Sequence, residues 1–205
     1  MPKSIEYLTL SYLNAWLDHD RIYCEALTSK SDDKKLQGIS KAAQHYKVAR
    51  NLPTRFDVDK GLKRYEPVLK VLDNIKTTDF SIDDVESIKK VERNISKAYG
   101  GRGALSFTTK LLWIKMPGNV IIYDRRARNA LGTAEDDLKA YYKAWRAEYK
   151  IQKNEIDRAC KELSAIAMYA SNQAIASSTY IKKISAKHWF KERVFDTMLW
   201  DRGRP

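Results

Sequence analysis

Hydrophobic side chains recur every three or four positions along most of this 205-residue chain, which is the spacing of amphipathic helices. The first segment shows the pattern well, with Leu8, Tyr12, Leu13, Trp16 and Leu17 on one face. No stretch alternates between apolar and polar residues for more than four or five positions, as a half-buried strand would. The sequence therefore predicts an all-α fold.

The helical pattern breaks where glycine, proline or charged residues gather. These breaks predict helices over residues 4–28, 36–50, 58–76, 81–99, 104–116, 124–132, 135–172 (broken once) and 186–200. Lys30–Lys35 is expected to be a polar loop, Ser81 a helix cap and Val120–Tyr123 a short extended run. Because no long linker divides the chain, residues 1–205 are expected to form a single compact helical domain. Two helical lobes around a central cleft are the alternative.

The charge of the chain points to a polyanionic partner. Lys and Arg number 38 against 26 for Asp and Glu, giving a net charge of +12. Nucleic acid is the first expectation and an anionic membrane surface the second. The two cysteines, Cys24 and Cys160, are too few for a disulfide framework, and the three histidines lie far apart. We therefore expect neither a metal site nor a cofactor.

The chain also lacks the patterns of exported and membrane-spanning proteins. No apolar run approaches 18 residues, and the N-terminus has no basic segment followed by an apolar core. The expected location is the cytoplasm of a prokaryote or virus, or a nucleus.

The segment from Tyr99 to Leu131 carries the candidate chemistry. It contains a glycine cluster at residues 100–103, an apolar helix, a turn at residues 116–119 and then Asp124. Three arginines follow the aspartate within four residues: Arg125, Arg126 and Arg128. Apolar residues surround most of the helix over 105–116, so we expect it to be buried, with Thr108 and Lys115 on its wet side.

Lys110 lies on an apolar side of that helix, about 140° from Leu105, between Trp113 and Ile114. One interpretation is a lysine whose stem packs while its ammonium reaches solvent. The other is an amine held in a partly apolar cleft, where desolvation lowers its pKa and leaves some of it nucleophilic.

Asp124 also has two interpretations, which are compatible. It stands between the extended run and a helix, where an aspartate commonly caps the helix N-terminus. A capping carboxylate is fixed in direction, so it could also point into a cleft as a catalytic group.

This arrangement resembles the helix-hairpin-helix DNA glycosylase superfamily, and more closely its 8-oxoguanine DNA glycosylase-like branch. The corresponding parts are Gly101-Arg102-Gly103 in the hairpin, Lys110 in SFTTKLLW and Asp124 in IIYDRRARNAL. The C-terminal KERVFDTMLW is similar to the closing helix of that branch. The resemblance covers about 35 residues and implies that the protein excises a modified or damaged base from double-stranded DNA, as a monomer and without a cofactor.

The chain departs from the family pattern at two places. The family lysine usually sits two residues after the second hairpin glycine, where this chain has Leu105, and Lys110 comes five residues later. The spacing between the family's lysine position and its aspartate is kept when Asp124 is counted from Leu105, but Asp124 lies only 14 residues after Lys110. Arg102 replaces the apolar residue usual between the glycines. The enzyme is therefore either bifunctional, with Lys110 as the nucleophile, or monofunctional, with Asp124 and water.

The resemblance also implies how DNA would be held. Hairpin glycines expose backbone N–H groups to phosphates, and a flipped base stacks on aromatic side chains. The candidate DNA contacts are Gly101, Arg102, Gly103, Arg125, Arg126 and Arg128, and the candidate pocket walls are Trp113, His188 and Trp189. Solvated surface charge and plain core packing are the competing interpretations. A non-catalytic DNA-binding helical protein and a protein-interaction module remain as alternative functions. The sequence does not identify the target base. It also does not decide between a role in DNA repair and a role in defence against phage.

Overall fold

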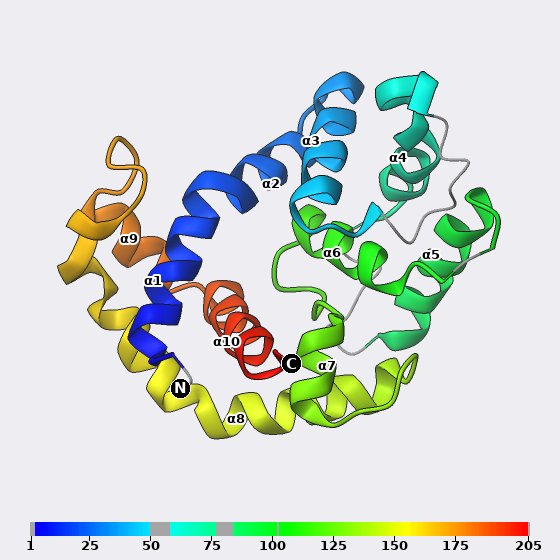
Figure 1. Cartoon of the computed structure of the whole chain (residues 1–205). Coiled ribbons are helices and arrows are strands. Elements are labelled where there is room, and N and C mark those ends of the chain that lie inside the picture. The colour runs from blue at the N-terminus through cyan, green and yellow to red at the C-terminus, as the bar shows by residue number, and fades with distance from the viewer. Residues whose placement is uncertain (1–2, 50–57, 77–83, 102, 205) are drawn as a thin grey trace. The chain divides into compact units, whose positions relative to one another are not determined.

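The computed structural model describes residues 3–49, 58–76, 84–101 and 103–204. All regular secondary structure in these residues is helical, which confirms the all-α prediction (Figure 1). Ser81 and Arg102 lie outside the described residues, and the N-cap of the described helix α5 (Val85–Ala98) is Asp84.

The chain divides into two compact units that are not continuous in sequence. Unit 1 consists of Met1–His19 and Asp124–Pro205, and unit 2 of Asp20–Tyr123. The chain therefore leaves unit 1 after His19 and returns to it at Asp124. A cleft between two lobes stays a prediction.

Unit 1 is built around its last helix. α10 (His188–Arg202) packs against α1 (Ile5–Ala15), α7 (Arg125–Leu131) and α8 (Leu138–Glu162), as Figure 1 shows. α8 continues into a 3₁₀ segment, η5 (Leu163–Tyr169), and α9 (Ser178–Ser185) precedes α10. Aromatic side chains fill the core: the Trp145 and Phe195 ring centroids lie 4.9 Å apart, as do those of Tyr12 and Phe190. Eight of the fifteen residues of α10 are buried, and they include the charged side chains of Glu192, Arg193 and Asp196.

Unit 2 is built around α6 (Leu105–Lys115), which packs against α2 (Arg21–Leu27), α3 (Asp32–His45) and α5 (Val85–Ala98). The remaining elements are a 3₁₀ segment, η3 (Val58–Tyr65), and α4 (Glu66–Asp73). A π-helical turn, η1 (Trp16–Asp20), joins α1 to α2. Every residue of α6 from Phe107 to Ile114 is buried, which confirms the expected buried helix.

Three local predictions need correction. Thr108 is fully buried, so the wet side expected for α6 does not include it. The loop expected over Lys30–Lys35 is wrong from residue 32 onward, because Ser31 caps α3 by accepting a hydrogen bond from the Lys34 N–H. Asp32 and Asp33 then favour the first turn through the helix dipole. The sequence pattern also missed α9, a helix of only eight residues capped by Ser177.

Candidate functional site

Asp124 caps the N-terminus of α7, as the sequence predicts. Its backbone is extended (φ −132°, ψ 140°), and its carboxylate Oδ1 accepts a hydrogen bond of 2.9 Å from the Arg126 N–H. At the other end, Gly132 closes α7 in the left-handed conformation with φ +64°. The carboxylate of the half-buried Asp124 therefore has a direction fixed by its own helix.

The residue before Asp124 is anchored in unit 2. Val120–Tyr123 are buried, and the Tyr123 N–H donates a hydrogen bond of 3.0 Å to the Thr109 hydroxyl. Tyr123 is the last residue of unit 2, and Asp124 is the first residue after it, in unit 1.

A second aspartate of unit 1 interacts electrostatically with Asp124. Asp196, on α10, is buried, and it accepts hydrogen bonds from Trp145 Nε1 at 2.7 Å and from an Arg193 guanidinium nitrogen at 3.0 Å. Burial mainly, and the charge of Asp124 in addition, raise the pKa of Asp196, while Arg193 and Trp145 oppose the shift. No sequence pattern connects Asp196 with Asp124, which lies 72 positions earlier in the chain.

The three arginines after Asp124 do not share one role. Arg125 is exposed, and the Arg126 guanidinium lies 4.1 Å from the centroid of the Trp200 ring on α10. Both residues line an open pocket at the ends of α7 and α10. Arg128 instead forms an ion pair of 3.7 Å with Glu135, and it does not line this pocket.

Lys110 lies in unit 2 and is only 4% exposed. Its Nζ donates a hydrogen bond of 2.8 Å to Ser106 Oγ, one helical turn earlier, and lies 5.9 Å from the centre of the Tyr46 ring. The Tyr46 hydroxyl in turn donates to the carboxylate of Asp20, which is buried. With this burial, the Lys110 side chain packs among other residues and its Nζ does not reach solvent. Its role as nucleophile stays a prediction, as does the role of Asp124 in unit 1.

The glycine cluster ends α5. Gly100 and Gly101 have φ values of +90° and +84°, and the Gly101 N–H donates a hydrogen bond of 2.8 Å to the Ser96 carbonyl. Gly103 is exposed, and the next amide, that of Ala104, donates to the Glu92 carboxylate at 2.7 Å. That amide is therefore already occupied by a carboxylate of α5. Phosphate binding by Gly101, Arg102 and Gly103 stays a prediction, and Arg102 lies outside the described residues.

The candidate pocket walls are divided between the two units. Trp113 belongs to the core of unit 2 and is 1% exposed. In unit 1, Trp189 packs on Trp16 with ring centroids 4.5 Å apart, and His188 is exposed on the first turn of α10. A role of these three residues in binding a flipped base stays a prediction.

A buried acidic residue next to His188, Glu192, was not among the candidates identified from the sequence. Glu192 is 5% exposed, and its carboxylate lies 3.2 Å from His188 Nδ1. Burial above all, and then the neighbouring Asp196, raise the pKa of Glu192 to about 8, against the opposing charge of Arg146. In the sequence Glu192 stands between Lys191 and Arg193, so no hydrophobic pattern marks it as buried.

Glu192 should make the stability of the protein depend on pH. In the unfolded chain its carboxyl loses its proton near the ordinary pKa of 4.5, but in the folded chain only near 8. Its contribution to stability is therefore fully present below about pH 4.5 and is lost as the pH rises through about 8. Glu192→Gln, which mimics the protonated form, should become more stable relative to wild type between pH 5 and pH 9, by roughly a few kcal/mol.

Urea denaturation at several pH values measures this difference. Glu155→Gln, at an exposed position of α8, is the matched control and should follow the wild-type curve. Wild type and Glu192→Gln curves that run parallel with pH would show that Glu192 has an ordinary pKa.

Comparison with protein-family models, with curated proteins and with solved structures finds no match for this chain. Within the described residues, no group of three or more His, Cys, Asp or Glu side chains is arranged to hold a metal ion. None of the described helices combines the length and the apolar character needed to cross a membrane.

Proposed function

We propose that this protein is a DNA glycosylase that flips a modified or damaged base out of double-stranded DNA and cleaves its N-glycosidic bond. The observation that carries the proposal is Asp124: a half-buried carboxylate held in a fixed direction by the α7 cap, directly before two arginines that line a pocket. The net charge of +12 supports a DNA partner independently.

In this function Asp124 acts on the sugar. Cleavage of the N-glycosidic bond develops positive charge on the sugar ring, and a carboxylate beside it stabilises that charge or removes a proton from the attacking water. Water then forms the new bond to the anomeric carbon, while the base leaves with the electron pair of the broken bond. The bifunctional form adds Lys110, whose neutral amine attacks the anomeric carbon in place of water. The base leaves, the sugar ring opens, and the amine and sugar are joined as an imine.

A DNA-binding protein without chemistry is the second candidate. The arginine-lined pocket favours it, because phosphate binding there needs neither Asp124 nor Lys110. Such a protein would act as a regulator, or as an accessory protein of a phage or of a defence system.

One assay separates the two candidates. The protein is incubated with duplexes that each contain a single modified base, including oxidised purines and bulky phage-type modified bases, and abasic sites are detected by alkaline strand cleavage. A glycosylase should release one class of base and leave unmodified duplex intact. Tight binding of every duplex with no abasic site would favour the non-catalytic candidate, and neither binding nor excision would overturn both.

A further inference from the structure

Four arginines from the ends of two helices converge on one pocket of unit 1. Arg125 and Arg126 come from the first turn of α7, Arg202 is the last residue of α10, and Arg204 lies two residues beyond it. The pocket has a volume of about 440 Å³, and its other lining residues are Asn129, Ala130 and Gly203. No acidic side chain is among these lining residues, so the lining itself carries only positive charge.

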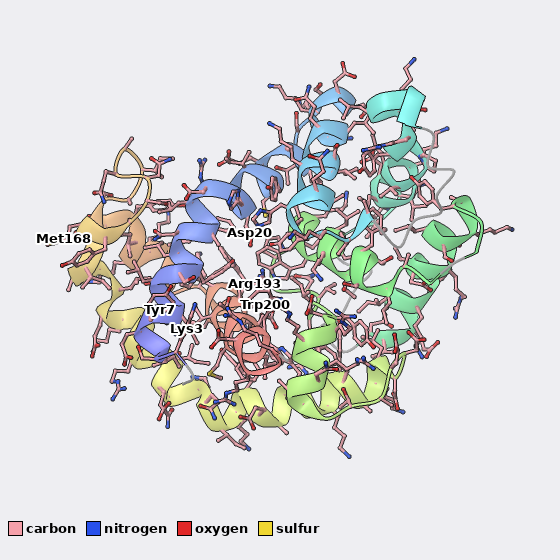
Figure 2. The ribbon with its side chains drawn as sticks, viewed as in Figure 1. Lys3, Tyr7, Asp20, Met168, Arg193 and Trp200 are labelled. Atoms are coloured by element: carbon pink, nitrogen blue, oxygen red, sulfur yellow. The ribbon has the colours of Figure 1, made fainter. Side chains whose placement is uncertain are left out.

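Neighbouring side chains hold three of the four guanidinium groups in place. Trp200, which is labelled in Figure 2, lies on α10. The centroid of its ring is 4.1 Å from the Arg126 guanidinium and 5.0 Å from that of Arg204. Arg202 also pairs with Glu148 at 2.9 Å, and Arg204 with Asp201 at 3.0 Å. Contacts of this kind reduce the side-chain entropy that the arginines would lose on binding a ligand.

The close approach of the two helix ends depends on Gly203. A Cβ atom at this position would lie only 1.9 Å from the Arg126 carbonyl oxygen, and the obstacle is backbone rather than a flexible side chain. Only a glycine therefore lets the end of α10 meet the first turn of α7. The pocket therefore depends on the close packing of these two backbone segments as well as on its arginine side chains.

The chemistry of the pocket selects its ligand. Guanidinium groups present paired N–H donors that match the oxygens of a phosphate, and their planar shape favours this anion over a spherical one. Glu148 and Asp201 offset two of the four positive charges. The other two positive charges favour the binding of an anionic group.

We infer that the ends of α7 and α10 together form one composite binding site for a single backbone phosphate of DNA. Arg202 and Arg204 are the new members of the site, next to Arg125 and Arg126. The inference rests on the proposed function for its partner, DNA, but it needs no catalytic step. Asp124 is the N-cap of α7, directly before Arg125 and Arg126. A phosphate held by these arginines would therefore fix the DNA strand relative to Asp124.

The test is the salt dependence of binding to an unmodified duplex. The slope of log affinity against log salt falls by about one for each phosphate contact that is lost. The α7 pair (Arg125→Gln, Arg126→Gln), the α10 pair (Arg202→Gln, Arg204→Gln) and the fourfold variant are compared with wild type by fluorescence anisotropy. Each pair should lower the slope by about one, and the fourfold variant should lower it by about one as well, because all four arginines share one phosphate.

The matched control removes two charges elsewhere on unit 1. Lys182→Gln with Lys183→Gln, exposed on α9, lowers the net charge as much as either arginine pair and should leave the slope within the error of wild type. Circular dichroism confirms that each variant is folded. A slope unchanged by the α10 pair, or losses that add to about two in the fourfold variant, would overturn the composite site.

Inorganic phosphate distinguishes a DNA phosphate from a free one. At constant ionic strength, phosphate should compete with duplex binding by wild type more than by the α10 pair. If wild type binds inorganic phosphate in calorimetry while DNA binding is unaffected by every arginine variant, the site serves a small phosphate compound and the inference is wrong. Failure of the proposed function would look different, because no base would be excised while the salt slopes still behaved as described.

Discussion

Replacing Asp124 by asparagine is expected to reduce base excision by at least about 100-fold while the protein stays folded. Asparagine is as good an N-cap as aspartate, and its side-chain oxygen can still accept the hydrogen bond that Asp124 now takes from the Arg126 N–H. The substitution therefore removes the charge that would stabilise the sugar cation and leaves α7 in place. Initial rates of abasic-site formation on the preferred substrate, together with a thermal melt, measure the two effects.

Asp137→Asn is the control for this change. Asp137 caps α8 in the same unit and accepts a hydrogen bond of 2.9 Å from the Ala140 N–H, so the same chemical change is made at an equivalent kind of position. Excision by this variant should equal that of wild type. If Asp124→Asn also excised at the wild-type rate, Asp124 would be a helix cap and nothing more.

Lys110→Gln is expected to abolish the covalent complex that borohydride traps between a bifunctional glycosylase and DNA. Borohydride reduces the imine between an amine and the opened sugar to a stable amine, so the loss of one lysine identifies the nucleophile. Lys110 is the candidate because it is buried on α6 and its Nζ is held by Ser106 at 2.8 Å. Denaturing electrophoresis of labelled DNA after reduction measures the crosslinked fraction.

Lys115→Gln provides the contrast on the same helix. Lys115 is half-buried in the last turn of α6, about 140° around the helix from Lys110, and its loss should leave the crosslink intact. A crosslink that survives Lys110→Gln would assign the nucleophile to another amine. Excision without any crosslink in wild type would instead establish the monofunctional form, in which Asp124 works with water.

The sequence alone predicted the features that depend on interactions between near neighbours along the chain. The spacing of apolar residues gave the all-α class and the buried α6, because a helix must turn its apolar residues toward other protein. Asp124 and Gly132 were identified as the two ends of α7, since a cap needs only its own helix. The same local reasoning failed at Lys30–Lys35, where the charged residues conceal the cap formed by Ser31.

Tertiary structure decided which distant residues meet. Residues 1–19 join residues 124–205 in one unit, and no sequence pattern marks that boundary. Thr108 is polar yet fully buried, because partner helices surround α6 on all sides. Glu192 and Asp196 carry shifted pKa values only because α10 is enclosed by the rest of its unit. Arg202 and Arg204 reach the pocket of Arg125 and Arg126 because Gly203 lets the end of α10 touch the backbone of α7, a steric condition that exists only once both helices are packed.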